Sequence, residues 1–197
     1  FNNKKNFGIS YCLNVGIIES KGDFIARMDS DDFSFIRRFE KQVNYLAKNS
    51  SIDLVGSSII LFEKKNKILG KKNCFGNHND LTKFFWKEIP IPHPTWMVRR
   101  NFFIDNLYEE DCYRGQDQEI LIRSMKNKVF YCLEESLLGY RFNKKSIKSR
   151  SIGRYRVYLS IRKKINLFDR MRFIQHHFLA FLRDWLSDLL NLHTNSL

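Results

Sequence analysis

The alternation between helix-like and strand-like patterns is the feature of this sequence that most limits its fold. Residues 9–20 place apolar side chains at the i, i+3 and i+4 spacing of one helical face. The short apolar run FIARM at residues 24–28 and the β-branched run IDLVGSSIILF at residues 52–62 are typical of strands, and a helical pattern at residues 34–49 separates them. This order predicts an α/β fold with a largely parallel sheet.

The helix predicted at residues 34–49 directly follows the first strand. Ser34 can cap its N-terminus, and its apolar stripe consists of Phe35, Phe39, Val43 and Leu46. The same periodicities predict the later elements: a polar hairpin or loop at 63–72, a short helix at 79–88, a strand that follows three prolines within 89–100, a helix at 115–127, one or two strands at 128–142, and helix from about residue 150 onward.

Composition narrows the class of protein. An apolar fraction of 43% with 15% aromatic residues excludes a disordered chain. The sequence has no run of about 18 apolar residues, so no transmembrane helix is predicted. Its cysteines form no C-x-x-C pair and have no histidine at zinc-ligand spacing, so we expect small buried residues in a reducing compartment; they are Cys12, Cys74, Cys112 and Cys132.

Positive charge is concentrated late in the chain. Residues 141–172 contain twelve Lys or Arg residues and one acid, Asp169, so they carry a net charge of +11 out of the +13 of the whole chain. This segment predicts a localised anionic partner. We therefore divide the chain into a core at residues 1–147 and a basic amphipathic helical tail at residues 148–197.

One broad apolar face runs along the predicted tail; it contains Ile174, Phe178, Phe181, Trp185 and Leu189. A basic helix with such a face suits an anionic membrane surface. It equally suits a partner helix or the core of the domain itself. The charge also fits a nucleic-acid-binding module, but the aromatic residues follow helical spacing and no nucleic-acid motif is present, so nucleic acid is not the expected partner.

An acidic cluster, in the stretch ARMDSDD, follows the first predicted strand. Asp29, Asp31 and Asp32 fall within four positions of an otherwise basic chain. Ionised neighbours raise the pKa of one another, so a metal ion, an arginine or water should lie among them. Ligands of open α/β sheets bind beyond the carboxyl ends of strands, where this cluster is predicted to lie. The alternative is a solvated loop whose acids favour the N-terminus of the next helix.

Several short motifs of the sequence resemble, in their order along the chain, the motifs of family-2 glycosyltransferases with the GT-A fold. They are LNVGI, KGDFIA, DSDD, RRFEKQ and IDLVGS in the first third of the chain, PHPTWMVRR and GQDQEILIR further on, and YRFNKKSIKS near the end of the predicted core. The resemblance covers roughly residues 5–150. It implies a GT-A type of α/β core, related to the nucleotide-binding Rossmann folds, followed by the basic helical extension.

The resemblance also implies a nucleotide-sugar donor, whose diphosphate leaves as the glycosidic bond breaks. A divalent cation with hard oxygen ligands neutralises that charge, so Mn²⁺ or Mg²⁺ is the expected cofactor. Asp31, the second acid of the D-x-D motif, is expected to bind the metal. Asp29 is expected either to help hold the metal or to face the donor ribose. Arg27 has the strand parity of Asp29, so it can offset charge or touch phosphate. Asp32 is also expected on the donor side.

For the acceptor, the resemblance assigns Asp117 as the general base that takes a hydroxyl proton in an inverting transfer. The alternative is an acid stabilised by the dipole at a helix N-terminus. Gln116, which replaces the Glu that the family usually has, and Asn143 are also expected to bind donor or acceptor. Asn143 stands where the family often has a His, a possible metal ligand, and its neutral carbonyl oxygen is a weaker ligand for Mg²⁺ or Mn²⁺. His93 is expected to contact donor phosphate or acceptor, or else to be a hydrogen-bonded loop histidine.

The expected function is sugar transfer to a saccharide or lipid-linked acceptor in surface polysaccharide or lipopolysaccharide synthesis. The expected location is the cytoplasm, with peripheral contact at the inner face of a bacterial membrane. We also expect this chain, which starts at Phe1, to lack the first βαβ stretch of the family, which holds the base and ribose of the nucleotide. The alternative function is therefore a non-catalytic remnant of such an enzyme.

Overall fold

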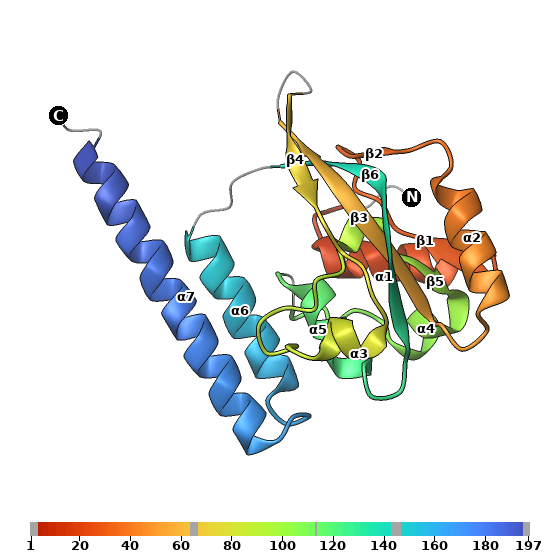
Figure 1. The fold of residues 1–197 in the computed structure, drawn as a ribbon. Coiled ribbons are helices and arrows are strands. Elements are labelled where there is room, and N and C mark those ends of the chain that lie inside the picture. Colours follow the sequence, from red (N-terminus) through yellow and green to blue (C-terminus); the bar gives the residue numbers. More distant parts are fainter. Residues whose placement is uncertain (1–3, 64–66, 113, 143–146, 195–197) are drawn as a thin grey trace.

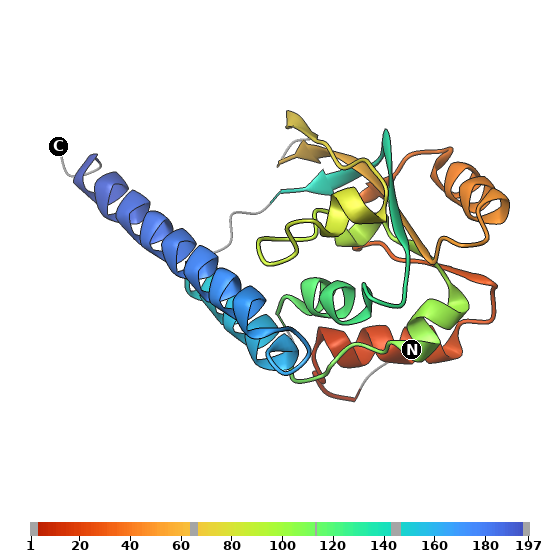
Figure 2. The same ribbon diagram turned by 60° about the horizontal axis from the view of Figure 1, so that its bottom comes forward.

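A computed structural model describes residues 4–63, 67–112, 114–142 and 147–194. In this part of the chain a six-stranded sheet separates two layers of helices (Figures 1 and 2). Its strands are β1 (Phe24–Ala26), β2 (Phe33–Ser34), β3 (Leu54–Phe62), β4 (Ile68–Lys72), β5 (Met97–Arg99) and β6 (Phe130–Arg141). The helices are α1 (Ile9–Glu19), α2 (Arg38–Lys48), α3 (His78–Thr82), the 3₁₀ helix η2 (His93–Thr95), α4 (Arg100–Asp105), α5 (Gln116–Ser124), α6 (Ile147–Ile161) and α7 (Leu167–Thr194).

The sheet is mixed, which corrects the expectation of a largely parallel one. The strand order is β1-β5-β3-β6-β2, and β4 pairs with β3 outside this path. Among the described strands, β3 and β6 form the parallel pair and the other neighbours are antiparallel. β4 pairs back onto β3 as the returning strand of the predicted hairpin or loop, whose residues 64–66 lie outside the described part of the chain, and the two-residue β2 follows the acidic turn onto β6. β5 pairs antiparallel with β1 and β3, which are distant from it in the sequence. The α/β class itself is confirmed.

Side-chain alternation along β3 divides the core between the two faces of the sheet. Leu54 belongs to the larger cluster, which also contains residues of α1, α4, α5 and α6. Val55 points the other way and packs with Leu46 of α2. Burial of a β-branched strand on both faces explains its continuous apolar run. Figure 2 shows α2 on one side of the sheet and α1 and α5 on the other.

Helix α2 differs from its prediction in both its start and its buried face. It begins at Arg38, because Ser34 lies in β2 and the Phe35 amide donates to the carbonyl of Leu137 at 3.1 Å. Its fully buried positions are Arg38, Gln42 and Leu46, whereas Phe39 is 53% exposed. The expected stripe was therefore wrong at Phe39.

Arg38 and Gln42 form a buried polar clamp across the strand ends. Arg38 Nη2 donates to the carbonyl of Arg27 at 2.7 Å, and its Nε donates to Gln42 Oε1 at 3.0 Å. Gln42 Nε2 then donates to the carbonyls of Thr95 and Val55. A buried guanidinium is stable only when such acceptors replace water. The clamp therefore fixes the end of β1 relative to β5 and β3.

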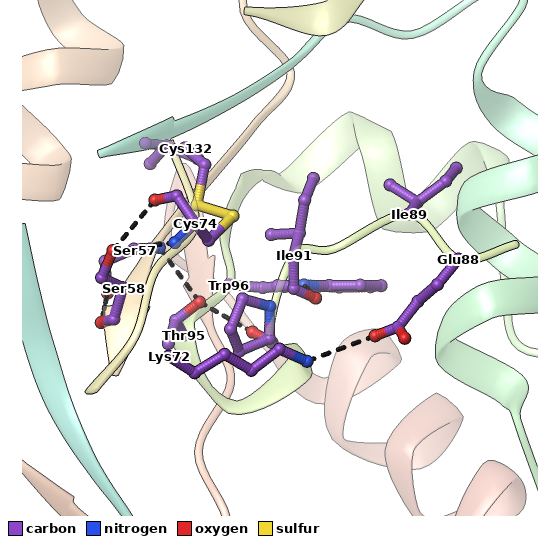
Figure 3. The surroundings of a disulfide bond; sticks show 12 residues. Ser57, Ser58, Lys72, Cys74, Glu88, Ile89, Ile91, Thr95, Trp96 and Cys132 are labelled. Carbon is purple, nitrogen blue, oxygen red and sulfur yellow. Dashed lines mark hydrogen bonds and ion pairs between the residues drawn. A yellow bond between two sulfur atoms is a disulfide. The ribbon is translucent and has the colours of Figure 1, made fainter. Parts of the chain in front are cut away.

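A disulfide joins Cys74 and Cys132, across 58 residues of sequence (Figure 3). This overturns the expectation that these two cysteines are unlinked buried residues. Backbone hydrogen bonds between Gly76 and Cys132 bring the segment after β4 beside β6, so the sulfur atoms meet. Both cysteines are buried against the sheet.

The C-terminal helices form an antiparallel pair at one end of the molecule (Figure 1). The first of them is part of the main core, since Val157 and Ile161 of α6 belong to the larger cluster. Ser160 also donates to the fully buried Glu119 of α5 at 2.9 Å. No helix in the described residues is long and apolar enough to cross a membrane. The division at residue 147 stays a prediction.

Replacement of Arg38 by Ala tests the clamp. The change leaves the carbonyl of Arg27 and the amide oxygen of Gln42 buried without their donor, so we expect the free energy of unfolding to fall by roughly 2–4 kcal/mol. Arg37→Ala is the matched control, because Arg37 is exposed and pairs only with Glu40 in the described structure. Urea denaturation of the two variants should separate them clearly. Equal stabilities would contradict the clamp.

Candidate active site

A cavity of about 790 Å³ lies where β1 ends and α5 begins. Charged and polar side chains from distant parts of the sequence share its wall: Arg27, Asp29, His93, Gln116 and Asp117. Five of the eight residues singled out from the sequence therefore meet in one cavity. Of the other three, Asp31 and Asp32 follow Asp29 in the same turn but do not line the cavity, and Asn143 lies outside the described residues.

The acidic turn after β1 is paired with an arginine. Arg27 is 9% exposed, and its Nη1 and Nη2 donate to the two carboxylate oxygens of Asp29 at 2.9 and 2.5 Å. A two-pronged contact of this kind holds both side chains in one orientation. Arg27 is therefore the positive charge that the structure places among the aspartates, on the wall of the cavity.

The far end of β6 holds the other half of the turn. The Arg141 amide donates to Asp32 Oδ1 at 2.8 Å, and Arg141 Nε donates to the carbonyl of Asp31 at 3.1 Å. Burial raises the pKa of Asp32 to about 6, against the lowering effect of the Arg141 hydrogen bond, and the charges of Asp29 and Asp31 raise it further. The carboxylate of Asp31 is left at the exposed rim.

The turn offers ligands suited to a substrate-borne cation. Within the described residues, no group of three or more His, Cys, Asp or Glu side chains is arranged to hold a metal. Mg²⁺ sites that work on phosphates, however, commonly use one or two carboxylates together with phosphate oxygens and water. The hard oxygen donors of Asp29 and Asp31 fit that requirement, and a cation or phosphate entering there would meet the Arg27–Asp29 pair.

Asp117 lies in the first turn of α5 and lines the same cavity. Gly115 caps the helix with a φ of 79°, a left-handed conformation that favours glycine. An added Cβ there would also lie 2.7 Å from Val157 Cγ2 of α6. Gln118 exchanges two hydrogen bonds with the backbone of Ile89. These contacts fix the helix start, and thereby the position of Asp117 on the cavity wall.

His93 is held by a partner that the sequence did not reveal. Its Nε2 lies 2.7 Å from the hydroxyl of Tyr108, and its ring packs edge-on against the fully buried Trp96. Burial raises the pKa of Tyr108, the charge of Asp117 raises it further, and Arg27 opposes the shift. Tyr108 thus stays a neutral partner of His93, which is hydrogen-bonded and still lines the cavity.

Other structural residues were missed because they are polar at buried positions. Glu119 is fully buried and is paired with Arg123 at 2.8 Å. Arg38 and Gln42 lie within RRFEKQ, one of the motifs on which the family resemblance rests. That motif could have indicated that these two residues have a structural role. Hydropathy periodicity could not find these residues, since it assigns polar side chains to the solvent side.

With this geometry in view, the comparisons with known proteins give the family. The model described as glycosyl transferase family 2 matches residues 1–107, more than half of the chain. The chain therefore belongs to that family.

Three relatives illustrate the similarity. An uncharacterized glycosyltransferase, MJ1057 of Methanocaldococcus jannaschii, is 33% identical over 141 residues, which are 71% of this chain and 49% of that protein. The O-antigen biosynthesis glycosyltransferase WbnJ of Escherichia coli is 29% identical over 150 residues, 75% of this chain and 58% of that one. A UDP-Gal:alpha-D-GlcNAc-diphosphoundecaprenol beta-1,3-galactosyltransferase of E. coli is 24% identical over 161 residues, which are 80% of this chain and 58% of that protein. The chain spans about half the length of these relatives.

Solved structures confirm the fold. The crystal structure of Staphylococcus aureus TarS residues 1–349 superposes with a TM-score of 0.61 at 14% identity, over 89% of this chain and 53% of that one. The structure of TarS residues 1–349 in complex with UDP-GlcNAc gives a TM-score of 0.55 at 13% identity, over 87% of this chain and 53% of that one. At such identities the likeness concerns the fold alone, and it confirms a GT-A type of α/β domain.

Gly115→Ala tests how α6 sets the position of Asp117. Both the positive φ and the close approach of Val157 oppose a Cβ, so we expect a loss of roughly 2 kcal/mol of stability and weaker docking of α6. Gly153→Ala is the matched control, since the nearest atom to its added Cβ is an ordinary 3.6 Å away and the helix gains propensity. Thermal unfolding should therefore shift in opposite directions. A stabilised Gly115→Ala would contradict this packing.

Proposed function

We propose that this chain transfers a sugar, with inversion, from a nucleotide-sugar donor to a saccharide or lipid-linked acceptor. The observation that carries the proposal is the shared cavity, which is lined both by Asp29, paired with Arg27, and by Asp117. A cavity of about 790 Å³ with few converging polar groups is typical of a small-molecule site.

The acidic turn is the proposed donor side. The TarS complex with UDP-GlcNAc, and the E. coli relative that is named as a UDP-Gal galactosyltransferase, support a UDP-sugar as the donor. Asp29 and Asp31 would hold Mn²⁺ or Mg²⁺, which supplies charge neutralisation for the leaving diphosphate when bound. Arg27 orients Asp29 and adds a fixed positive charge on the cavity wall. Asp32, buried and bonded to Arg141, keeps the turn in place.

The start of α5 is the proposed acceptor side. A carboxylate within hydrogen-bond reach of the acceptor hydroxyl takes its proton as the oxygen attacks the anomeric carbon, and Asp117 has that role here. Gln116, 9% exposed beside it, offers an amide to a sugar hydroxyl without adding negative charge. His93, fixed by Tyr108, completes the polar wall as a hydrogen-bonding contact.

The acceptor is proposed to be part of surface polysaccharide synthesis. One relative is named for O-antigen biosynthesis and another for a sugar on diphosphoundecaprenol. The exposed apolar residues of α7 support peripheral contact with an anionic membrane at its inner face; they include Leu167, Met171 and Trp185. The basic segment at 141–172 adds electrostatic attraction to such a surface.

Asp117→Asn tests the proposed base in the protein that carries this chain. The amide cannot take a proton, so sugar transfer should fall by about 10²–10⁴-fold while donor affinity is largely kept. Asp111→Asn is the matched control, because Asp111 is an exposed acid six residues earlier that does not line the cavity. Turnover of a radiolabelled UDP-sugar measures both. Undiminished turnover in Asp117→Asn refutes the assignment.

Asp31→Ala tests the donor side separately. Loss of one of two carboxylate ligands should weaken Mn²⁺-dependent binding of a UDP-sugar by about tenfold or more. The control is Asp23→Ala, an exposed acid before β1. Calorimetric titration of UDP-GlcNAc and UDP-Gal, with Mn²⁺ and with EDTA, gives the affinities. A donor affinity that neither EDTA nor Asp31→Ala changes would exclude this metal site.

A further inference from the structure

An apolar groove of about 360 Å³ runs between α6 and α7. Its apolar lining consists of Tyr155, Tyr158, Phe173, Ile174, Phe178 and Phe181. Phe173 is buried at 3% exposure, whereas Tyr155, Ile174 and Phe178 are more than half exposed or close to it, at 61, 50 and 59%. The groove is therefore an apolar hollow open to solvent, which is unfavourable unless an apolar ligand covers it.

The groove continues into the candidate active site. Arg154, Phe173 and His177 line both the groove and the larger cavity that contains Asp29 and Asp117. Helix α6 is the common wall, since it packs against the start of α5 and also against α7 (Figure 1). The two hollows therefore adjoin each other at Arg154, Phe173 and His177.

Basic side chains lie on the wall of the larger cavity, and one of them is also on the wall of the groove. Arg114 and Arg154 both line the cavity that contains Asp117, and Arg154 lines the groove as well. Arg114 donates to Ser149 of α6, and Arg154 is held 3.4 Å from Asp184 of α7. A carboxylate, arginines and an adjoining apolar hollow suit, respectively, a sugar hydroxyl, phosphates and a hydrocarbon chain.

We propose that the groove between α6 and α7 binds the hydrocarbon chain of a lipid-diphosphate-linked acceptor, whose phosphates lie at Arg114 and Arg154 while its sugar reaches Asp117. This inference rests on the proposed function and adds to it a binding site for the lipid. A second copy of the chain is a poorer occupant, since pairing would bring two segments of net charge +11 together. Apolar residues of α7 outside the groove, such as Leu167 and Trp185, remain available to a membrane surface.

Farnesyl diphosphate is a suitable probe, because it has an isoprenoid chain and a diphosphate but no sugar. It should bind at least about tenfold more tightly than inorganic diphosphate, which lacks the chain. The double variant Ile174→Ser/Phe178→Ser should lose about tenfold in affinity for it. The control pair is Leu179→Ser/Leu186→Ser, two exposed residues of α7 that do not line the groove. Calorimetry gives the affinities, and thermal unfolding checks that all variants fold.

The inference is overturned if the two double variants bind farnesyl diphosphate equally, or if loss of binding follows only a loss of dimerisation measured by light scattering. Transfer assays separate it from the proposed function. The groove variant should raise KM for a lipid-linked acceptor about tenfold with kcat unchanged, and should leave transfer to a water-soluble acceptor sugar unaffected. Unchanged KM for the lipid-linked acceptor overturns the groove alone. Absence of transfer to either acceptor in the unmodified protein, with farnesyl diphosphate still bound, overturns the proposed function alone.

Discussion

The hydrogen bond from Arg38 to the carbonyl of Arg27 sets the direction in which the chain leaves β1, and the proposed donor side of the site depends on it. Arg38 is fully buried and is itself oriented by Gln42, which binds two further strand carbonyls. Because the Arg27 backbone is fixed, its side chain is delivered to the cavity wall, where it pairs with Asp29. Arg141 secures the other end of the same turn. Carboxylates that would otherwise repel are thereby held in place before any ligand arrives.

The proposed acceptor side depends on a second set of contacts, between α5 and α6. Gly115 allows α6 to approach the start of α5, and Glu119 accepts a hydrogen bond from Ser160. The basic helical segment therefore forms part of the cavity that contains Asp117. The helical segment that supplies positive charge to the cavity therefore also forms part of its wall. A tail joined only by a linker could not do this.

Local sequence patterns predicted most of the helices and strands, but they did not predict the features that depend on residues far apart in the sequence. The acidic turn follows a strand and Asp117 lies at a helix start, as predicted, because both features depend on a few adjacent residues. Strand direction was not predictable, since β5 runs against both of its neighbours through long-range pairing. The Cys74–Cys132 disulfide joins residues 58 apart, and Tyr108 reaches His93 across the fold. Buried Arg38 and Gln42 reverse the hydropathy rule that assigned the face of α2.

The central claim is that Asp29 and Asp117 serve one reaction across one cavity. The most direct measurement is a crystal structure of the protein with a UDP-sugar and Mn²⁺. Our account predicts the diphosphate and the metal at the Asp29–Asp31 turn, with the anomeric carbon of the sugar facing the carboxylate of Asp117 across the cavity. A donor bound outside this cavity, or with its sugar turned away from Asp117, would contradict the account.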